Sequence, residues 1–171
     1  MKYFITMLTL ITLTGCSASY PNQNLLGQPF IAVSGQSLAQ QQVNIPGDFN
    51  GEKTLLLIGY KQQTQFDIDR WLIALHMSEL SITTYELPVL TGLSTKIMRP
   101  VINNGMRDGI PKELWHAVIT VYSQGEKVQK FTGNVKPNNA RVVLLNEKGE
   151  VIYFYDRGFS VAALAALKQL I

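Results

Sequence analysis

The chain has 171 residues, enough for one domain with its own hydrophobic core. Hydrophobic residues make up 46% of the chain, which excludes disorder throughout. The formal net charge is only +3, which does not indicate nucleic-acid binding, and the single cysteine excludes a dithiol redox centre.

Residues 1–16, MKYFITMLTLITLTGC, have the layout of a secretory leader. Lys2 supplies a positive start, and the apolar run Phe4–Leu13 is too short to cross a bilayer. Leu13-Thr14-Gly15-Cys16 resembles the lipobox of bacterial lipoproteins, whose cysteine is lipidated after cleavage. The resemblance implies a signal peptide over residues 1–15 and lipidation of Cys16. The alternative is an ordinary secretory signal with an unrelated cysteine.

The three acyl chains that this resemblance implies would hold a soluble domain on a membrane, because one chain alone binds only marginally. Ser17 follows the cysteine, where lipoproteins retained at the inner membrane of enteric-type bacteria often carry aspartate. The resemblance therefore favours the outer membrane, on its periplasmic side. Residues 16–28 predict a lipidated tether, because they are mostly small and polar, and residues 29–171 predict the folded domain.

Two short extended segments begin the domain, Phe30–Val33 and, after a turn at Ser34–Ser37, Gln40–Val43. The apolar run Thr54–Tyr60 then suits a strand that is covered on both faces. Thr64 and Asp67 predict the start of a helix after that strand. Its apolar residues repeat at helical spacing and predict one stripe against a sheet: Ile68, Trp71, Leu72 and Leu75.

The remaining chain alternates strands with helical segments. Pro100 lies in the next helical pattern, Ile97–Met106, and either begins a helix or kinks a longer one. Gln124–Gly133 is either a short helix or a turn followed by extended chain. The other predicted elements are strands at Ile82–Leu87 and Ala117–Tyr122, a hairpin of Arg141–Leu145 with Val151–Tyr155, and a last helix capped by Ser160.

This order resembles the thioredoxin-like fold over Lys53–Ile171, most specifically in the hairpin ARVVLLNEKGEVIYF and the helix after it. The resemblance implies an α/β domain with a central mixed sheet flanked by helices, preceded here by a short N-terminal β extension. The redox Cys-x-x-Cys of that superfamily corresponds to about Gln63–Phe66, where both thiols are absent. Its cis-proline corresponds to Ala140 or Arg141 and is also missing; Pro137 lies a few residues early.

A narrower resemblance lies in Met98–Trp115, MRPVINNGMRDGIPKELW. The stretch is similar to the R-x-x-I-P-x-x-x-W segment of thioredoxin-like ATP-synthase assembly factors, which also lack a dithiol. The matching residues are Arg107, Ile110, Pro111 and Trp115. The resemblance implies a non-redox assembly or chaperone-like role.

Sequence motifs for catalysis are missing. No glycine-rich phosphate loop, nucleophile elbow or zinc-protease spacing occurs. His76 and His116 are better interpreted as ordinary side chains at the edges of elements than as metal ligands or acid–base groups. We therefore predict no metal site and no cofactor.

The basic residues are concentrated in one segment. Ser94–Arg141 contains eight basic and three acidic residues, a net charge of +5, and the rest of the mature chain has a net charge of −3. A basic face toward anionic headgroups or an acidic partner is one interpretation, and a solvated surface is the other. The candidate binding residues are Arg99, Arg107 and Lys112 in this segment, and Gln63 and Phe66 at the strand end.

These observations predict a membrane-anchored, redox-inactive thioredoxin-like lipoprotein of the cell envelope. We expect it to act as a binding protein, adaptor or assembly factor with a protein partner, and not to bind nucleic acid. The alternatives are an enzyme of unknown reaction, using non-cysteine groups at the strand end, and a structural envelope protein.

Overall fold

The computed structural model describes residues 18–49 and 51–171. The predicted signal peptide and Cys16 lie outside these ranges, so lipidation stays a prediction. Within them, no helix is both long and apolar enough to span a bilayer.

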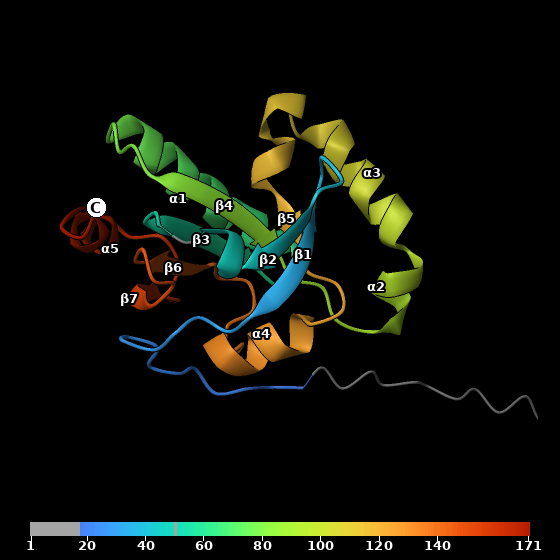
Figure 1. Ribbon diagram of the computed structural model, residues 1–171, viewed down its shortest axis with the longest axis horizontal. Helices are drawn as coiled ribbons and strands as arrows, with labels where there is room; N and C mark the ends of the chain where they lie inside the picture. Colours follow the sequence, from blue (N-terminus) through green and yellow to red (C-terminus); the bar gives the residue numbers. More distant parts are fainter. Residues whose placement is uncertain (1–17, 50) are drawn as a thin grey trace, which may run out of the picture.

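The central sheet has four strands in the order β4-β3-β6-β7 (Figure 1). β3 and β4 are parallel, while β6 pairs antiparallel with both β3 and β7. Every residue of β3 is buried, as its unbroken apolar run predicts. The strands are β3 (Thr54–Gly59), β4 (Thr83–Pro88), β6 (Arg141–Leu145) and β7 (Val151–Tyr155).

The predicted N-terminal extension, β1 and β2, forms a small antiparallel sheet together with β5, in the order β2-β1-β5, and β5 is only two residues of the predicted strand Ala117–Tyr122. Its strands are β1 (Val33–Ser37), β2 (Gln42–Ile45) and β5 (Ile119–Thr120). The predicted turn at residues 34–37 is wrong, because Ser34–Gln36 pair with β2 and the chain turns afterwards, at Gln40 with a φ of 68°. Two isolated parallel bridges, Glu86–Val118 and Val89–Val121, join this sheet to the β4 edge.

Five helices accompany the sheets in the described part of the chain: α1 (Gln65–Met77), α2 (Leu93–Ile97), α3 (Arg99–Gly109), α4 (Gly125–Thr132) and α5 (Val161–Lys168). Short 3₁₀ helices occur at η1 (Gly47–Phe49), η2 (Gln62–Thr64) and η3 (Lys112–Ala117). Pro100 lies in the first turn of α3, where it loses no helical hydrogen bond, and this favours the interpretation that a helix begins there. The ambiguous segment after Gln124 is the helix α4.

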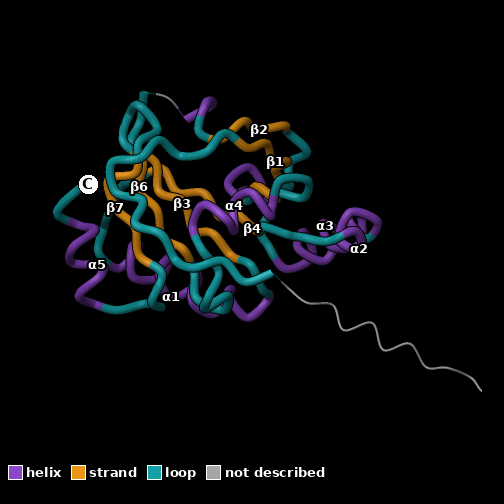
Figure 2. The backbone as a smooth tube through the Cα atoms, turned by 90° about the horizontal axis from the view of Figure 1, so that it is seen from below, coloured by secondary structure: helices purple, strands orange, loops and turns teal. Residues whose placement is uncertain are grey.

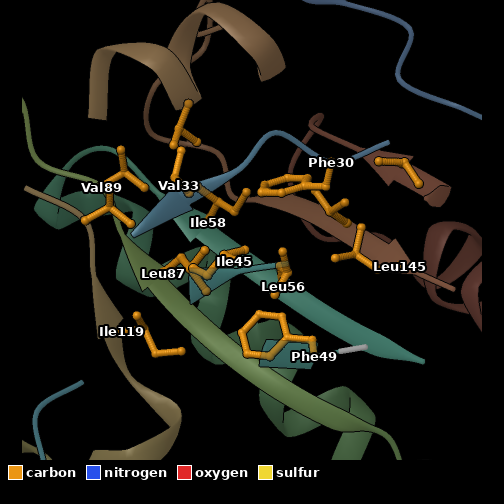
Figure 3. Close-up of a cluster of buried hydrophobic side chains, with 14 of the residues drawn as sticks. Phe30, Val33, Ile45, Phe49, Leu56, Ile58, Leu87, Val89, Ile119 and Leu145 are labelled. Carbon is orange, nitrogen blue, oxygen red and sulfur yellow. The ribbon is translucent and has the colours of Figure 1, made fainter. Parts of the chain in front are cut away.

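The hydrophobic core has two parts, one on each face of the central sheet. Leu56 and Ile58 of β3 pack with the residues of the N-terminal extension, as Figure 3 shows. Leu55 and Leu57 face the opposite way, toward α1 and α5, which lie on the same side of the sheet (Figure 2). Alternate residues of one strand thus supply both parts.

The helix α1 buries Ile68, Trp71 and Leu75, as its spacing predicts. Leu72 does not follow the prediction, since 37% of its side chain is exposed. Successive helical residues are about 100° apart, so Leu72 lies at the edge of a stripe that is centred on its neighbours.

Part of the predicted tether packs on the domain. Tyr20 and Asn134 exchange backbone and side-chain hydrogen bonds, Leu25 is buried, and the Gly27 N–H donates to the carbonyl of Val151. Residues 20–28 belong to no helix or strand, and the next residue, Pro29, makes an isolated bridge with Glu150. The contacts described above nevertheless fix this segment to the surface of the domain.

Candidate binding groove

A cavity of about 540 Å³ lies at the carboxyl ends of β3 and β4. We call it the strand-end groove. Three segments line it: the end of β3 with the chain that follows, the end of β4 with Leu90, and α3 with Ile110. Its lining includes Tyr60, Lys61, Gln62, Gln65, Ile68, Glu86, Leu90, Val101, Ile102, Gly105, Met106 and Ile110. The volume falls within the range of ligand-binding sites, about 300–1,000 Å³.

The wall after β3 is held in place by two small residues. A Cβ at Gly59 would approach Ile68 and Thr64 to 3.3–3.4 Å, so glycine lets α1 pack closely on the strand end. Thr64 is buried, and its hydroxyl accepts from the Lys61 N–H and donates to the carbonyl of Pro137. These bonds join the start of α1 to the loop before β6.

The helix α1 begins where Thr64 and Asp67 predict, with Thr64 at its N-cap and Asp67 in its first turn, but the Thr64 side chain makes no capping bond to α1. The Asp67 carboxylate instead accepts from the backbone N–H groups of Ala140 and Phe159, at 2.8 and 2.6 Å. Asp67 thereby ties α1 to β6 and to the loop before α5, which is a long-range role that no local pattern reveals.

The wall formed by α3 is apolar toward the groove, where Val101, Ile102 and Met106 lie at helical spacing. Its other side is fastened to the small sheet. The Arg107 guanidinium donates twice to the carbonyl of Leu38, at 2.9 and 2.8 Å, and lies over the Trp115 ring.

Arg99 and Asn103 extend the same attachment. Arg99 donates to the side-chain oxygen of Gln36 at 2.8 Å and lies over the Tyr122 ring. Asn103 is buried and accepts from the Tyr122 hydroxyl at 2.6 Å. The groove therefore exists because a polar face fixes α3 to the small sheet while its apolar face points to the strand ends.

The five predicted binding residues do not converge on this groove. Arg99 and Arg107 are partly buried and make the internal contacts described above. Lys112 is exposed at the start of η3. Gln63 and Phe66 are exposed at the predicted strand end but do not line the groove. Partner binding by these five residues stays a prediction.

Sequence reasoning missed Glu86. Its neighbours Tyr85 and Leu87 pack into the core with Leu56 and Ile58, so Glu86 points to the other face of the sheet, toward α1. A single acid inside a predicted strand, Ile82–Leu87, was the available signal. The apolar spacing of α3 was recognised, but only as a core-facing stripe.

The Glu86 carboxylate is partly buried and accepts one long hydrogen bond, 3.4 Å, from the Gln65 amide. Burial raises the pKa of Glu86; the bond from Gln65 opposes this and the nearby Asp69 carboxylate reinforces it. Between described side chains, the one ion pair is Glu126–Lys130 on α4, so the structure shows no cation paired with Glu86.

The lining residues differ from those of a thiol or serine active site. They include no cysteine, serine or histidine, and within residues 18–49 and 51–171 no cluster of three or more potential metal ligands occurs. His76 and His116 are exposed, at the ends of α1 and η3. The groove thus offers apolar walls, amide groups, one carboxylate and the exposed amino group of Lys61.

Arg141, one of the two residues that correspond to the cis-proline position by resemblance, is fully buried. Its guanidinium donates to the carbonyls of Gly133, Lys136 and Asn139 and lies over the ring of Tyr60, at 4.8 Å from the ring centroid. The loop before β6 is therefore organised around this side chain. Within residues 18–49 and 51–171, the cis peptide bond joins Ile45 to Pro46.

Comparison with known proteins identifies the fold. No family model matches the chain, and no curated protein sequence matches it. A thiol peroxidase from Chromobacterium violaceum has a TM-score of 0.58 at 12% identity, covering 90% of both chains. BsSco, a member of the Sco family of cytochrome c oxidase assembly proteins, has a TM-score of 0.60 at 12% identity, covering 87% of this chain and 95% of its own.

The pneumococcal exposed lipoprotein thioredoxin Etrx1, from Streptococcus pneumoniae, has a TM-score of 0.56 at 8% identity, covering 82% of this chain and all of its own. The chain is therefore an α/β protein with a thioredoxin-like fold and a small additional antiparallel sheet, as predicted. With one cysteine, it has no Cys-x-x-Cys pair.

Proposed function

We propose that this protein is a redox-inactive thioredoxin-like binding protein, an adaptor or assembly factor of the cell envelope. In this proposal, lipid on Cys16 anchors it to the membrane and the strand-end groove holds a segment of a protein partner. One observation carries the proposal. The strand end that bears the thiols in thioredoxin-like enzymes opens here onto an apolar groove whose lining contains no thiol.

Exposed apolar side chains next to the groove support a protein partner. Val101 lines the groove and is 66% exposed, and Met98, one turn earlier, is 50% exposed. Apolar surface that continues out of a groove is typical of docking sites for protein segments.

Two of the solved structures support other parts of the proposal. BsSco belongs to a family of assembly proteins, and Etrx1 is an exposed lipoprotein. The segment Met98–Trp115 adds the resemblance to assembly factors, and its matching residues contact one another. Trp115 donates from its indole to the carbonyl of Ile110, and Arg107 lies over the Trp115 ring.

Site-specific photocrosslinking tests the proposal in intact cells. A benzophenone amino acid at Val101, inside the groove, should crosslink to a partner protein. The same amino acid at Met77, which is 79% exposed at the far end of α1, is the control and should not.

A variant that fills the groove supplies the second test. Gly105 lines the groove, and a Cβ there would meet nothing within 4 Å, so Gly105→Phe should occupy the groove without disturbing the backbone. Gly109 also has free space and does not line the groove, which makes Gly109→Phe the matched control. Loss of the Val101 crosslink in the first variant alone supports the proposal. Absence of the crosslink in the unfilled protein, or its survival in Gly105→Phe, contradicts it.

A further inference from the structure

The strand-end groove has one carboxylate in its lining, that of Glu86. Most of the surrounding groups are uncharged: Ile68, Leu90, Ile102 and Met106 are apolar, and Gln62 and Gln65 are amides. An anionic group within such walls lacks much of the hydration that stabilises it in water. The charged side chains of the lining are Glu86, which is partly buried, and Lys61, which is exposed, so the partly buried charge that a ligand meets is negative.

The hydrogen bonds around Glu86 leave its carboxylate with free acceptor positions. The Gln65 amide donates to Asp69 at 2.9 Å and reaches Glu86 at 3.4 Å, so its shorter bond goes to Asp69. A carboxylate has about four acceptor sites, and this long bond uses one of them. Lys61, also in the lining, is exposed, and its amino group is not within 4 Å of the carboxylate.

We infer that the groove recognises a basic apolar peptide segment, in which an arginine or lysine reaches Glu86 and the flanking apolar residues pack on α3. The inference rests on the proposed function and specifies its ligand. The charge of Glu86 selects a cation, and the planar guanidinium of arginine matches a carboxylate with two hydrogen bonds. The hydrogen bonds from the guanidinium replace those that the carboxylate lost when it left water.

The extent of the apolar surface favours a peptide over a small amine. Val101 lies one turn after Ile97 and one short turn after Met98, and all three side chains are at least half exposed, at 66%, 74% and 50%. The apolar surface therefore continues out of the groove over the start of α3. A peptide can cover both regions, whereas a single small amine fills only the groove.

A peptide binding assay with the full-length protein in detergent tests the inference. The probes are three fluorescein-labelled heptapeptides with leucine and isoleucine around a central arginine, citrulline or glutamate. Citrulline keeps the shape of arginine and removes its charge. We expect the arginine peptide to bind at least about tenfold more tightly than the citrulline peptide, which corresponds to about 1.4 kcal/mol. The glutamate peptide should bind most weakly.

Glu86→Gln should bring the arginine and citrulline peptides to within about twofold of each other, because the amide keeps the shape and loses the charge. Glu113→Gln is the matched control, since Glu113 is exposed on η3, outside the groove, and should leave the preference unchanged. The comparison of arginine with citrulline on the unchanged protein needs no variant and stays decisive if Glu86→Gln fails to fold.

Failures of the inference and of the proposed function are distinguishable. Equal binding of the arginine and citrulline peptides overturns the inference. So does the absence of any peptide binding while Val101 still crosslinks to a partner, because the groove then takes another kind of segment. Only absence of the Val101 crosslink in the protein with an unfilled groove, or survival of the crosslink in Gly105→Phe, counts against the proposed function.

Discussion

Trp71 of α1 is fully buried against the central sheet. Its ring meets Tyr155 and Phe159 edge to face, with centroids 5.9 and 5.3 Å apart. We expect Trp71→Ala to lower the free energy of unfolding by about 3–5 kcal/mol, from lost burial and the cavity that remains. Urea denaturation checks this, with Ile73→Ala as the control, because Ile73 lies on the same helix and is 59% exposed. A loss below about 1 kcal/mol for Trp71→Ala would contradict the packing described here.

The ionised carboxylate of Glu86 should lower the stability of the folded protein, although the same charge favours binding of the proposed ligand. Burial raises its pKa above the ordinary 4.5, so the folded protein holds this proton more tightly than the unfolded chain does. The corresponding stability is present at acidic pH and is lost as pH rises through the ordinary pKa to the raised one. We therefore expect Glu86→Gln to raise the melting temperature at pH 7. The melting temperature of the variant should also fall less than that of the unchanged protein as the pH rises from about 4 to 7.

Melting curves of this variant across that pH range make the measurement, with Glu113→Gln as the exposed control. An unchanged pH profile in Glu86→Gln would mean that the carboxylate is solvated in the folded protein. A gain in stability together with a loss of the preference for the arginine peptide is the combination expected of a group that is kept for function.

At the scale of elements, α3 decides whether the groove exists. Arg99 and Arg107, two of the candidate binding residues, both donate hydrogen bonds to the small sheet and its turn. Hydrogen bonds from a charged donor contribute about 1.5–3 kcal/mol each. The attachment of α3 therefore depends on a few polar contacts and little apolar burial, since Asn103 is its one buried residue.

We expect Arg107→Gln to loosen α3 locally, because the Leu38 carbonyl loses both of its guanidinium donors. Amide hydrogen exchange over residues 99–110 should accelerate by about tenfold or more, while exchange in β3 stays slow. Lys112→Gln, at an exposed position just after the helix, is the control. An unchanged exchange rate in Arg107→Gln would contradict the role of Arg107 in holding α3, and this arginine would again be a candidate for partner binding.

At the scale of the whole molecule, we expect no thiol–disulfide exchange. Reduction of insulin disulfides by the purified protein should not exceed the background rate, because the chain has one cysteine and exchange through a protein dithiol needs two. The Cys16→Ser variant serves as the control for contaminating reductants. Activity above background that persists in this variant would contradict redox inactivity and would revive the enzyme alternative.

The anchor is a separate prediction about the whole molecule. Mass spectrometry of the mature N-terminus should find lipid on Cys16, and Cys16→Ser should leave the protein unprocessed or release it from membranes. An unmodified cysteine would contradict the anchor. It would leave the proposal for the groove untouched, because the residues that line the groove all lie between Gly59 and Ile110.

The sequence by itself determined the order and type of most elements. The unbroken apolar run of β3, the helical spacing of Ile68, Trp71 and Leu75, and the hairpin of β6 and β7 are local patterns, and they persist in the fold. Together with the single cysteine, they determined the fold class and the absence of a dithiol. Local patterns suffice here because burial produces a recognisable order of apolar residues. An element buried on one face has regularly spaced apolar residues, and a strand buried on both faces has an unbroken apolar run.

Only the tertiary structure decided what the charged residues do. Arg141 was part of the predicted basic surface and is fully buried, Arg99 and Arg107 fasten α3, and Asp67 joins α1 to β6. Glu86, which no motif marked, lies in the groove. Each role depends on partners distant in the sequence, such as Asp67 and Ala140, which are 73 residues apart. A charged side chain carries no periodic signal of its partner, so its function is determined only when packing brings the two together.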